Sequence, residues 1–245
     1  MKNPTFSPPL VLAEQEVPFW GFGEIFVCAA SFLVALNVLG ATAEHFLGHV
    51  AKLGTWAVAD EFTAYLIMFA VLKLFFARQG QPLLRSIAWV KTSFEATPLV
   101  VSGLLLFAVG VVLQFILRMP DSAQTPFEKM LASDRFSLVA ITLFGVTAGP
   151  VIEELLFRGL LQPVAIYATG VLPGILITSA IFAAMHLPQN GGVWQRGVII
   201  GIAGFGFGVI RHVTGSTRAS SIAHIAYNTL PFAVTLLQGT QPTHK

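Results

Sequence analysis

The sequence is poor in charge and in cysteine. Only 11% of its 245 residues are Asp, Glu, Lys or Arg, whereas 55% are hydrophobic. An average soluble domain carries about 25% charged residues, so this composition favours a polytopic membrane protein. The net charge of +2 is small and spread along the chain, which gives no reason to expect a nucleic-acid partner. The single cysteine, Cys28, excludes an internal disulfide framework and any Cys-x-x-Cys metal site.

The sequence shows no strand-like alternation of apolar and polar residues. It also shows no cleavable signal peptide, because the first 18 residues are polar and contain proline. Long apolar runs are present instead, and about 20 mostly apolar residues cross a bilayer as a helix. We predict seven such helices: Trp20–Ala41, Trp56–Ala77, Pro98–Leu117, Phe136–Ala168, Val171–Leu187, Gly197–Val213 and Ala219–Leu237. The predicted fold is therefore an all-α, polytopic transmembrane helical bundle of seven helices. It has eight if the fourth segment is divided or if the stretch after the second, which includes an interfacial segment at Leu83–Val90, counts separately.

The fourth segment carries Glu153, Glu154 and Arg158 inside an apolar run. One ionisable side chain at membrane depth costs roughly 2.5–3.5 kcal/mol, so three together indicate a functional site in a polar cavity. Glu154 and Arg158 have the four-residue spacing of an ion pair, and Glu153 is rotated from Glu154 by about 100°. We expect Arg158 to neutralise one carboxylate and leave the other for chemistry. Gly149-Pro150 should kink the helix and free a carbonyl. A purely structural ion-pair clamp is the alternative.

Two later segments carry polar residues four apart: Phe182 with His186, and His224 with Asn228. A lone histidine in such a segment is more often a packing residue. Two of them, on separate helices of a chain that also buries Glu-Glu-Arg, favour a shared site. Glutamate, histidine and asparagine can hold a water or a metal, remove a proton and stabilise an oxyanion.

Other features are weaker candidates for function. Glu24, Asp60 and Glu61 lie near predicted helix ends, where water can reach them. The sixth segment repeats glycine at spacings of three and four, which predicts a helix that packs closely in the bundle. The glycines of this repeat are Gly197, Gly201, Gly204 and Gly208.

Together these motifs resemble those of the CAAX-protease and bacteriocin-processing family, also called the Abi family, of intramembrane endopeptidases. The pattern is Glu153-Glu154-x-x-x-Arg158, Phe182-x-x-x-His186 and His224-x-x-x-Asn228, in this order. The resemblance covers residues 136–237, which would form the catalytic core. Residues 1–135 would supply N-terminal transmembrane helices without a recognised motif, within one integrated membrane domain.

The resemblance implies a role for each matched residue. Glu153 and His186 would activate water, His224 would assist them, and Asn228 would stabilise the tetrahedral oxyanion. The other residues that match the family's motifs would support the site, and these are Glu154, which belongs to the catalytic set, Arg158 and Phe182. Glu153, His186 and His224 could ligate zinc, as in a metalloprotease, and they suit equally a metal-free general base. Other protease patterns are missing, namely H-E-x-x-H, G-x-S-G and G-x-G-D.

The sequence thus predicts an intramembrane endopeptidase that contacts membrane lipid and cuts a membrane-associated or lipidated, CAAX-like protein or a leader peptide. A proton-coupled transporter and a non-catalytic scaffold remain alternatives, because buried Glu and His side chains also relay protons or clamp helices. Short loops and a small chain favour a bacterial inner-membrane protein. Arg78, Arg85 and Lys91 place the N-terminus on the cytoplasmic side, although Arg118, Lys129 and Arg135 then fall outside.

One geometric conflict accompanies the shared site. If the fifth helix starts at Pro173, His186 lies about 20 Å along it, whereas His224 lies only about 10 Å into the seventh helix, which enters from the same side. A tilt, a longer seventh helix or a later start of the fifth must bring the two imidazoles to one depth.

Overall fold

The structure is a computed structural model, and it describes residues 17–48, 54–120 and 124–239. These residues form helices and no strand, which confirms the predicted all-α bundle. The long helices are α1 (Phe22–Leu47), α2 (Gly54–Arg78), α4 (Ala96–Ile116), the continuous run Arg135–Thr169, α9 (Val171–His186), α10 (Trp194–Thr214) and α11 (Thr217–Gly239). Two short helices, α3 (Leu83–Ser86) and α5 (Pro126–Leu131), lie in connections.

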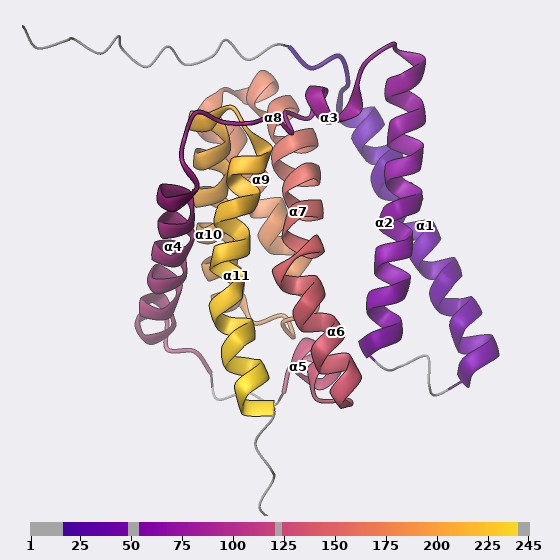
Figure 1. Cartoon of the computed structure of the whole chain (residues 1–245), viewed down its shortest axis with the longest axis vertical. Coiled ribbons are helices and arrows are strands. Elements are labelled where there is room, and N and C mark those ends of the chain that lie inside the picture. The colour runs from indigo at the N-terminus through magenta and orange to yellow at the C-terminus, as the bar shows by residue number, and fades with distance from the viewer. Residues whose placement is uncertain (1–16, 49–53, 121–123, 240–245) are drawn as a thin grey trace, which may run out of the picture.

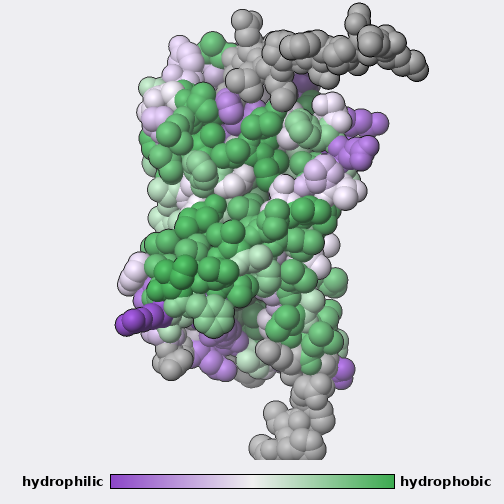
Figure 2. All heavy atoms as spheres, turned by 90° about the vertical axis from the view of Figure 1, so that its left-hand side faces the viewer, coloured by the Kyte–Doolittle hydropathy of each residue, from purple (hydrophilic) through white to green (hydrophobic). Residues whose placement is uncertain are grey.

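Four helices of the described residues are long and apolar enough to cross a membrane by length and composition: α1, α4, the run Arg135–Thr169, and α10. The others among the seven predicted segments are helical too, but they are shorter or more polar. Large apolar side chains of α4 point outward, for example Leu105 and Phe115 with 61% and 79% of their surface exposed. Figure 2 shows a broad hydrophobic surface across one face of the molecule, with hydrophilic residues toward its two ends. Such a surface suits a lipid environment.

The run Arg135–Thr169 carries the glutamates and is hereafter the motif helix. It consists of α6 (Arg135–Val146), α7 (Ala148–Glu154), a π-helical segment (Leu155–Leu161) and α8 (Gln162–Thr169). Figure 1 places it between the α1–α2 pair and the group formed by α4, α9, α10 and α11. Gly170, with φ of +90°, ends it and allows the sharp turn into α9.

The glycine repeat of α10 packs as predicted. Its glycines face α9 and the motif helix, because a Cβ at Gly197 would lie 2.9 Å from Leu187 and one at Gly208 would lie 2.8 Å from Ile175. A similar close approach joins α4 and α11, where a Cβ at Gly103 would meet the backbone of Ala223. The small residues therefore allow the helix spacing on which the site depends.

The segment after α3 determines where α11 begins. Ile87 is fully buried, and the Thr217 backbone N–H donates to the Ala88 carbonyl at 2.9 Å while its hydroxyl donates to the Ile87 carbonyl at 2.6 Å. A Cβ at Gly159 would touch both Ile87 and Thr217, so α11 starts beside the middle of the motif helix. Ten residues separate Gly159 from the end of that helix, or about 15 Å at 1.5 Å per residue. The predicted interfacial stretch Leu83–Val90 thus folds inward over the start of α11 (Figure 1).

Candidate active site

The motif helix is interrupted on both sides of its glutamates. Thr147 leaves helical geometry with φ of −130° and ψ of −87°. Because Pro150 has no N–H and its ring crowds the carbonyl four residues earlier, a break at this level is expected. The predicted kink is therefore present, about one turn before Gly149-Pro150. After Glu154 the helix widens into the π-helical segment, a feature that occurs frequently at functional sites.

Asn228 of α11 binds a backbone carbonyl of α6 just before this interruption. The Asn228 side-chain N–H donates to the Gly145 carbonyl at 2.8 Å. A carboxamide has two N–H donors, so this bond orients the side chain and leaves the second donor for another acceptor. Asn228 lines the same cavity as Glu153.

Glu154 and Arg158 form a sealed pair. Arg158 Nη1 lies 2.9 Å from Glu154 Oε1, and both side chains are fully buried. Arg158 Nη2 donates to the Gly204 carbonyl of α10 at 2.7 Å. The guanidinium also lies over the Phe182 ring, 4.6 Å from its centroid, in a cation–π arrangement. The predicted ion pair is present, and the Arg158 guanidinium does not line the cavity.

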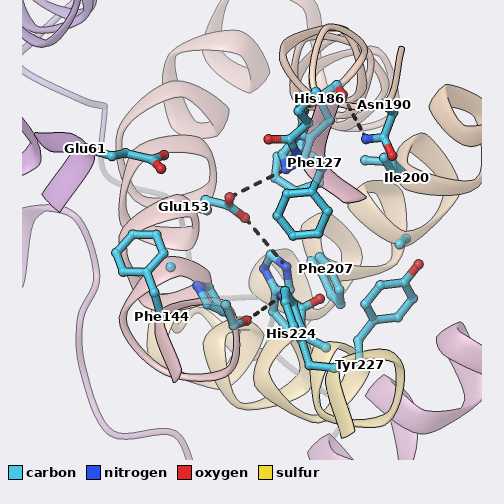
Figure 3. Close-up of a pocket in the computed structure, with 18 residues that line it drawn as sticks. Glu61, Phe127, Phe144, Glu153, His186, Asn190, Ile200, Phe207, His224 and Tyr227 are labelled. Atoms are coloured by element: carbon cyan, nitrogen blue, oxygen red, sulfur yellow. Dashed lines mark hydrogen bonds and ion pairs between the residues drawn. The ribbon is translucent and has the colours of Figure 1, made fainter. Parts of the chain in front are cut away.

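Glu153 lies between two imidazoles. Its Oε1 is 3.5 Å from His186 Nε2 and its Oε2 is 3.6 Å from His224 Nε2, with 24% of the glutamate side chain exposed (Figure 3). Both rings are held by their other nitrogen: His186 Nδ1 lies 2.8 Å from the Phe182 carbonyl, and His224 Nδ1 lies 3.0 Å from Glu154 Oε1. Carbonyl and carboxylate oxygens only accept, so each Nδ1 carries a hydrogen, and in the neutral form of either ring Nε2 is an acceptor directed at Glu153.

The predicted conflict over helix depth is resolved by these contacts. His186 ends α9, and α11 begins beside the middle of the motif helix, so His224, only seven residues after Thr217, is already at the depth of Glu153. The two histidines therefore share one carboxylate, and the shared-site hypothesis stands.

A cavity of about 230 Å³ opens beside Glu153. The catalytic candidates Glu153, His186, His224 and Asn228 line it, and so do aromatic side chains from several helices. Those aromatic residues are Phe127, Phe144, Phe182, Phe207, Tyr227 and Phe232. Phe182, predicted as a supporting residue, packs edge-on toward His224 and close to His186. The walls combine one polar centre with apolar surface, as peptide and ligand sites commonly do.

Sequence reasoning missed two walls of this cavity. Glu61 of α2 lines it, and Figure 3 shows its carboxylate directed toward the site, although the sequence indicated only a residue near a helix end that water can reach. An isolated carboxylate in an apolar helix was the available signal. Phe127 of α5 covers another side, and no pattern in the polar loop that contains it marked this residue.

Zinc was one prediction for this centre. Among the residues that the structure describes, no three His, Cys, Asp or Glu side chains are arranged as a cluster that could hold a metal ion. Zinc held by Glu153, His186 and His224 stays a prediction.

Fold and site together define an integral membrane protein with a buried glutamate–histidine centre. Residues 135–230 match the family model of the Rce1-like type II CAAX prenyl endopeptidases. The match confirms the resemblance to CAAX proteases over these residues and supports a CAAX-type intramembrane endopeptidase in general. No curated protein and no solved structure matches the chain.

Proposed function

We propose that this protein is an intramembrane endopeptidase in which Glu153 is the general base. The observation that carries the proposal is the Glu153 carboxylate placed between two imidazole Nε2 atoms at 3.5 and 3.6 Å on a cavity wall. These distances exceed the usual 2.7–3.2 Å of a direct hydrogen bond, and acceptors face each other across them. A water molecule that donates one hydrogen to Glu153 and one to an imidazole satisfies both.

Peptide hydrolysis follows from that arrangement. Glu153 takes a proton from the water as its oxygen attacks the scissile carbonyl carbon. The carbonyl oxygen becomes an oxyanion, to which the second N–H of Asn228 donates. The protonated Glu153, with His186 beside it, then delivers the proton to the departing nitrogen as the C–N bond breaks. One water is consumed, and the products are a carboxylic acid and an amine, between which the acidic proton then passes to give a carboxylate and an ammonium group.

The sealed pair supports this chemistry without touching the substrate. Glu154 accepts from His224 Nδ1, which keeps the ring in the tautomer that presents Nε2 to Glu153. Arg158 balances the charge of Glu154. Glu153 therefore remains the carboxylate that is available to water.

The substrate we propose is a membrane-associated or lipidated, CAAX-like protein or a leader peptide, cut in a bacterial inner membrane. An aromatic-lined cavity within a lipid-facing bundle supports a substrate that reaches the site in contact with the bilayer. Comparing cleavage of a prenylated peptide with cleavage of the same peptide without its lipid distinguishes a lipidated substrate from one that carries no lipid.

The direct test uses the full chain in lipid nanodiscs with fluorogenic forms of these peptides. We expect cleavage by the wild type, incorporation of one ¹⁸O from labelled water into the new carboxylate, and loss of cleavage in Glu153→Gln and in His186→Ala. Unchanged cleavage in both variants would exclude this mechanism. If no peptide is cut but proteoliposomes show a proton-coupled flux that Glu153→Gln abolishes, the transporter alternative takes its place.

A further inference from the structure

Among the described residues that line the cavity, Glu61 is the one carboxylate that the proposed chemistry does not use. It is contributed by α2, which lies outside the Rce1-like region 135–230. Glu61 lines the cavity with Glu153, and Figure 3 shows its carboxylate directed toward the other lining residues. The side chain is half-buried.

Packing of α2 fixes Glu61 in this direction. Toward the start of α2, Val58 packs on the cluster of Leu131, Leu138 and Ile141. One turn after Glu61, Tyr65 packs against a second apolar cluster, which groups Met68 and Leu72 of α2 with Leu160 of the π-helical segment and Val164 of α8. Phe62 meets Phe144 edge-on at 6.4 Å. Glu61 lies on α2 between these two apolar clusters, and its side chain forms part of the cavity wall.

Hydrogen bonding also holds the carboxylate in place. The Tyr65 hydroxyl donates to Glu61 Oε1 at 3.3 Å. Tyr65 is one turn further along the same helix and packs with the second apolar cluster, so it keeps Glu61 oriented but brings no charge. The bond is long for a hydroxyl donor, and the remaining lone pairs of the carboxylate face the cavity.

Charge around the cavity is unbalanced at Glu61. The other titratable groups that line the cavity in the described part of the chain are Glu153, His186, His224 and Tyr227. The two imidazoles contact Glu153, and the buried Arg158 contacts Glu154 and the Gly204 carbonyl. No lysine or arginine of the described residues forms a salt bridge with Glu61. A partly desolvated carboxylate beside a second carboxylate is unfavourable unless a cation joins it.

We propose that Glu61 is a specificity residue that binds a lysine or arginine side chain of the substrate, close to the scissile bond. This inference rests on the proposed endopeptidase function. The scissile carbonyl lies at Glu153 and Asn228, and the basic side chain crosses the cavity toward α2. An endopeptidase cuts inside a chain, so the cation comes from a side chain rather than from a free amino terminus. Phe144, beside Phe62 on this side of the cavity, offers an apolar surface for the methylene groups of that side chain.

The experiment compares arginine with citrulline, its neutral isostere, placed in turn at each position that flanks the scissile bond of a cleaved reporter. At one position the wild type should prefer arginine at least tenfold in kcat/KM. Glu61→Gln should reduce this ratio to near one, and Glu61→Lys should make a glutamate-containing peptide the better substrate. Asp60→Asn removes the neighbouring carboxylate of α2, which does not line the cavity, and should keep the wild-type ratio.

Two results would overturn the inference: a wild type without preference at any position, or a Glu61→Gln variant that loses both peptides by the same factor and keeps the ratio. Binding of the same labelled peptides to Glu153→Gln in nanodiscs separates this inference from the proposed function. If that variant prefers arginine and the Glu61→Gln/Glu153→Gln double variant does not, Glu61 recognises the cation whether or not the wild type cuts the peptide. Equal binding of the two peptides to Glu153→Gln counts against Glu61 even where cleavage is observed.

Discussion

The two faces of the motif helix treat adjacent carboxylates in opposite ways. On the sealed face, Glu154, Arg158 and Gln162 are buried almost completely, and the last two donate to the Gly204 and Gly208 carbonyls of α10 at 2.7 and 3.0 Å. On the open face, Glu153 lines a cavity between two imidazoles. One residue step, about 100° around the helix, separates a structural carboxylate from the proposed chemical one.

The contrast shows how a membrane helix can carry a reactive carboxylate. Arg158 neutralises Glu154 and, with Gln162, donates to two backbone carbonyls of α10, so the polar groups of the sealed face serve helix packing, although Glu154 Oε2, Arg158 Nε and Gln162 Oε1 have no hydrogen-bond partner among the described residues. His224 joins the two faces, because its Nδ1 contacts Glu154 and its Nε2 contacts Glu153. The sealed face thus orients a ring that acts on the open face, and substitutions on the two faces should separate stability from rate.

The largest expected effect on stability comes from Arg158→Met. The substitution leaves the Glu154 carboxylate buried without its cation and removes the bond to Gly204, so the free energy of unfolding should fall by about 3–5 kcal/mol. Thermal or denaturant unfolding in a fixed detergent measures this loss. Glu153→Gln is the matched control on the open face and should change stability by roughly 0.5 kcal/mol or less. Equal losses for the two variants would show that the faces do not differ.

Asn228→Ala should act mainly on rate. Removal of one oxyanion donor typically slows an enzyme by about 10²–10³-fold, or about 2.7–4 kcal/mol in the transition state. The lost bond to the Gly145 carbonyl should cost only about 1 kcal/mol of stability. Single-turnover cleavage of the reporter peptide measures the rate, and peptide binding to the variant should stay near the wild-type value. A loss that appears only in binding would contradict the oxyanion role.

Gly204→Ala tests how closely the sealed face is packed. A Cβ at Gly204 would lie 3.1 Å from both Arg158 Nη2 and the Phe182 ring, whereas one at Gly201 would lie 3.5 Å from Ala183, in ordinary contact. Both substitutions gain the same helix propensity, so it cancels in their difference. Gly204→Ala should therefore be about 1–3 kcal/mol less stable than Gly201→Ala, by the usual cost of overpacking. Equal unfolding temperatures would mean that Arg158 moves without cost.

Much of the site was predictable from sequence because helical spacing relates residues within one element. The Glu154–Arg158 pair, the glycine face of α10 and the kink before Pro150 all follow from positions four residues apart or from the chemistry of one residue. The family resemblance then grouped the polar residues of three helices. The carbonyl that Gly149-Pro150 should free stays a prediction, and the bond from Asn228 to the Gly145 carbonyl was not predicted.

What could not be predicted depends on contacts between distant elements. The depth of His224 depends on Thr217 bonding to the carbonyls of Ile87 and Ala88, more than a hundred residues earlier. Glu61 was ranked by its distance from a helix end, although the packing of α2 on the motif helix turns it into the cavity. Periodicity gives no information on either contact.

The smallest expected effect is on the packing of α5 over the cavity, and this effect depends on pH. Phe127 lines the cavity from α5, and its N–H donates to the Gln189 carbonyl at 3.1 Å. Glu128 of the same helix is joined to Arg196 of α10 at 3.0 Å. The Thr125 backbone N–H, together with the guanidinium of Arg196, holds the pKa of the Glu128 carboxyl below its ordinary value of 4.5. Docked α5 therefore favours the ionised carboxylate.

The sign follows from that lowered pKa: the contribution of Glu128 to docking is complete above pH 4.5 and is lost as the pH falls through the lower pKa of the docked state. Glu128 is 41% exposed, so solvent screening limits its pair with Arg196 to about 0.2–1 kcal/mol. Amide hydrogen exchange of residues 127–131, corrected for intrinsic rates, should show constant protection from pH 7 to 5 and a drop below pH 4. Glu128→Gln should lower protection at neutral pH by a comparable factor and flatten the pH profile. If Glu128→Gln keeps the wild-type pH profile, the charge on Glu128 has no part in the docking of α5. The docking would then depend on Phe127 and its apolar contacts.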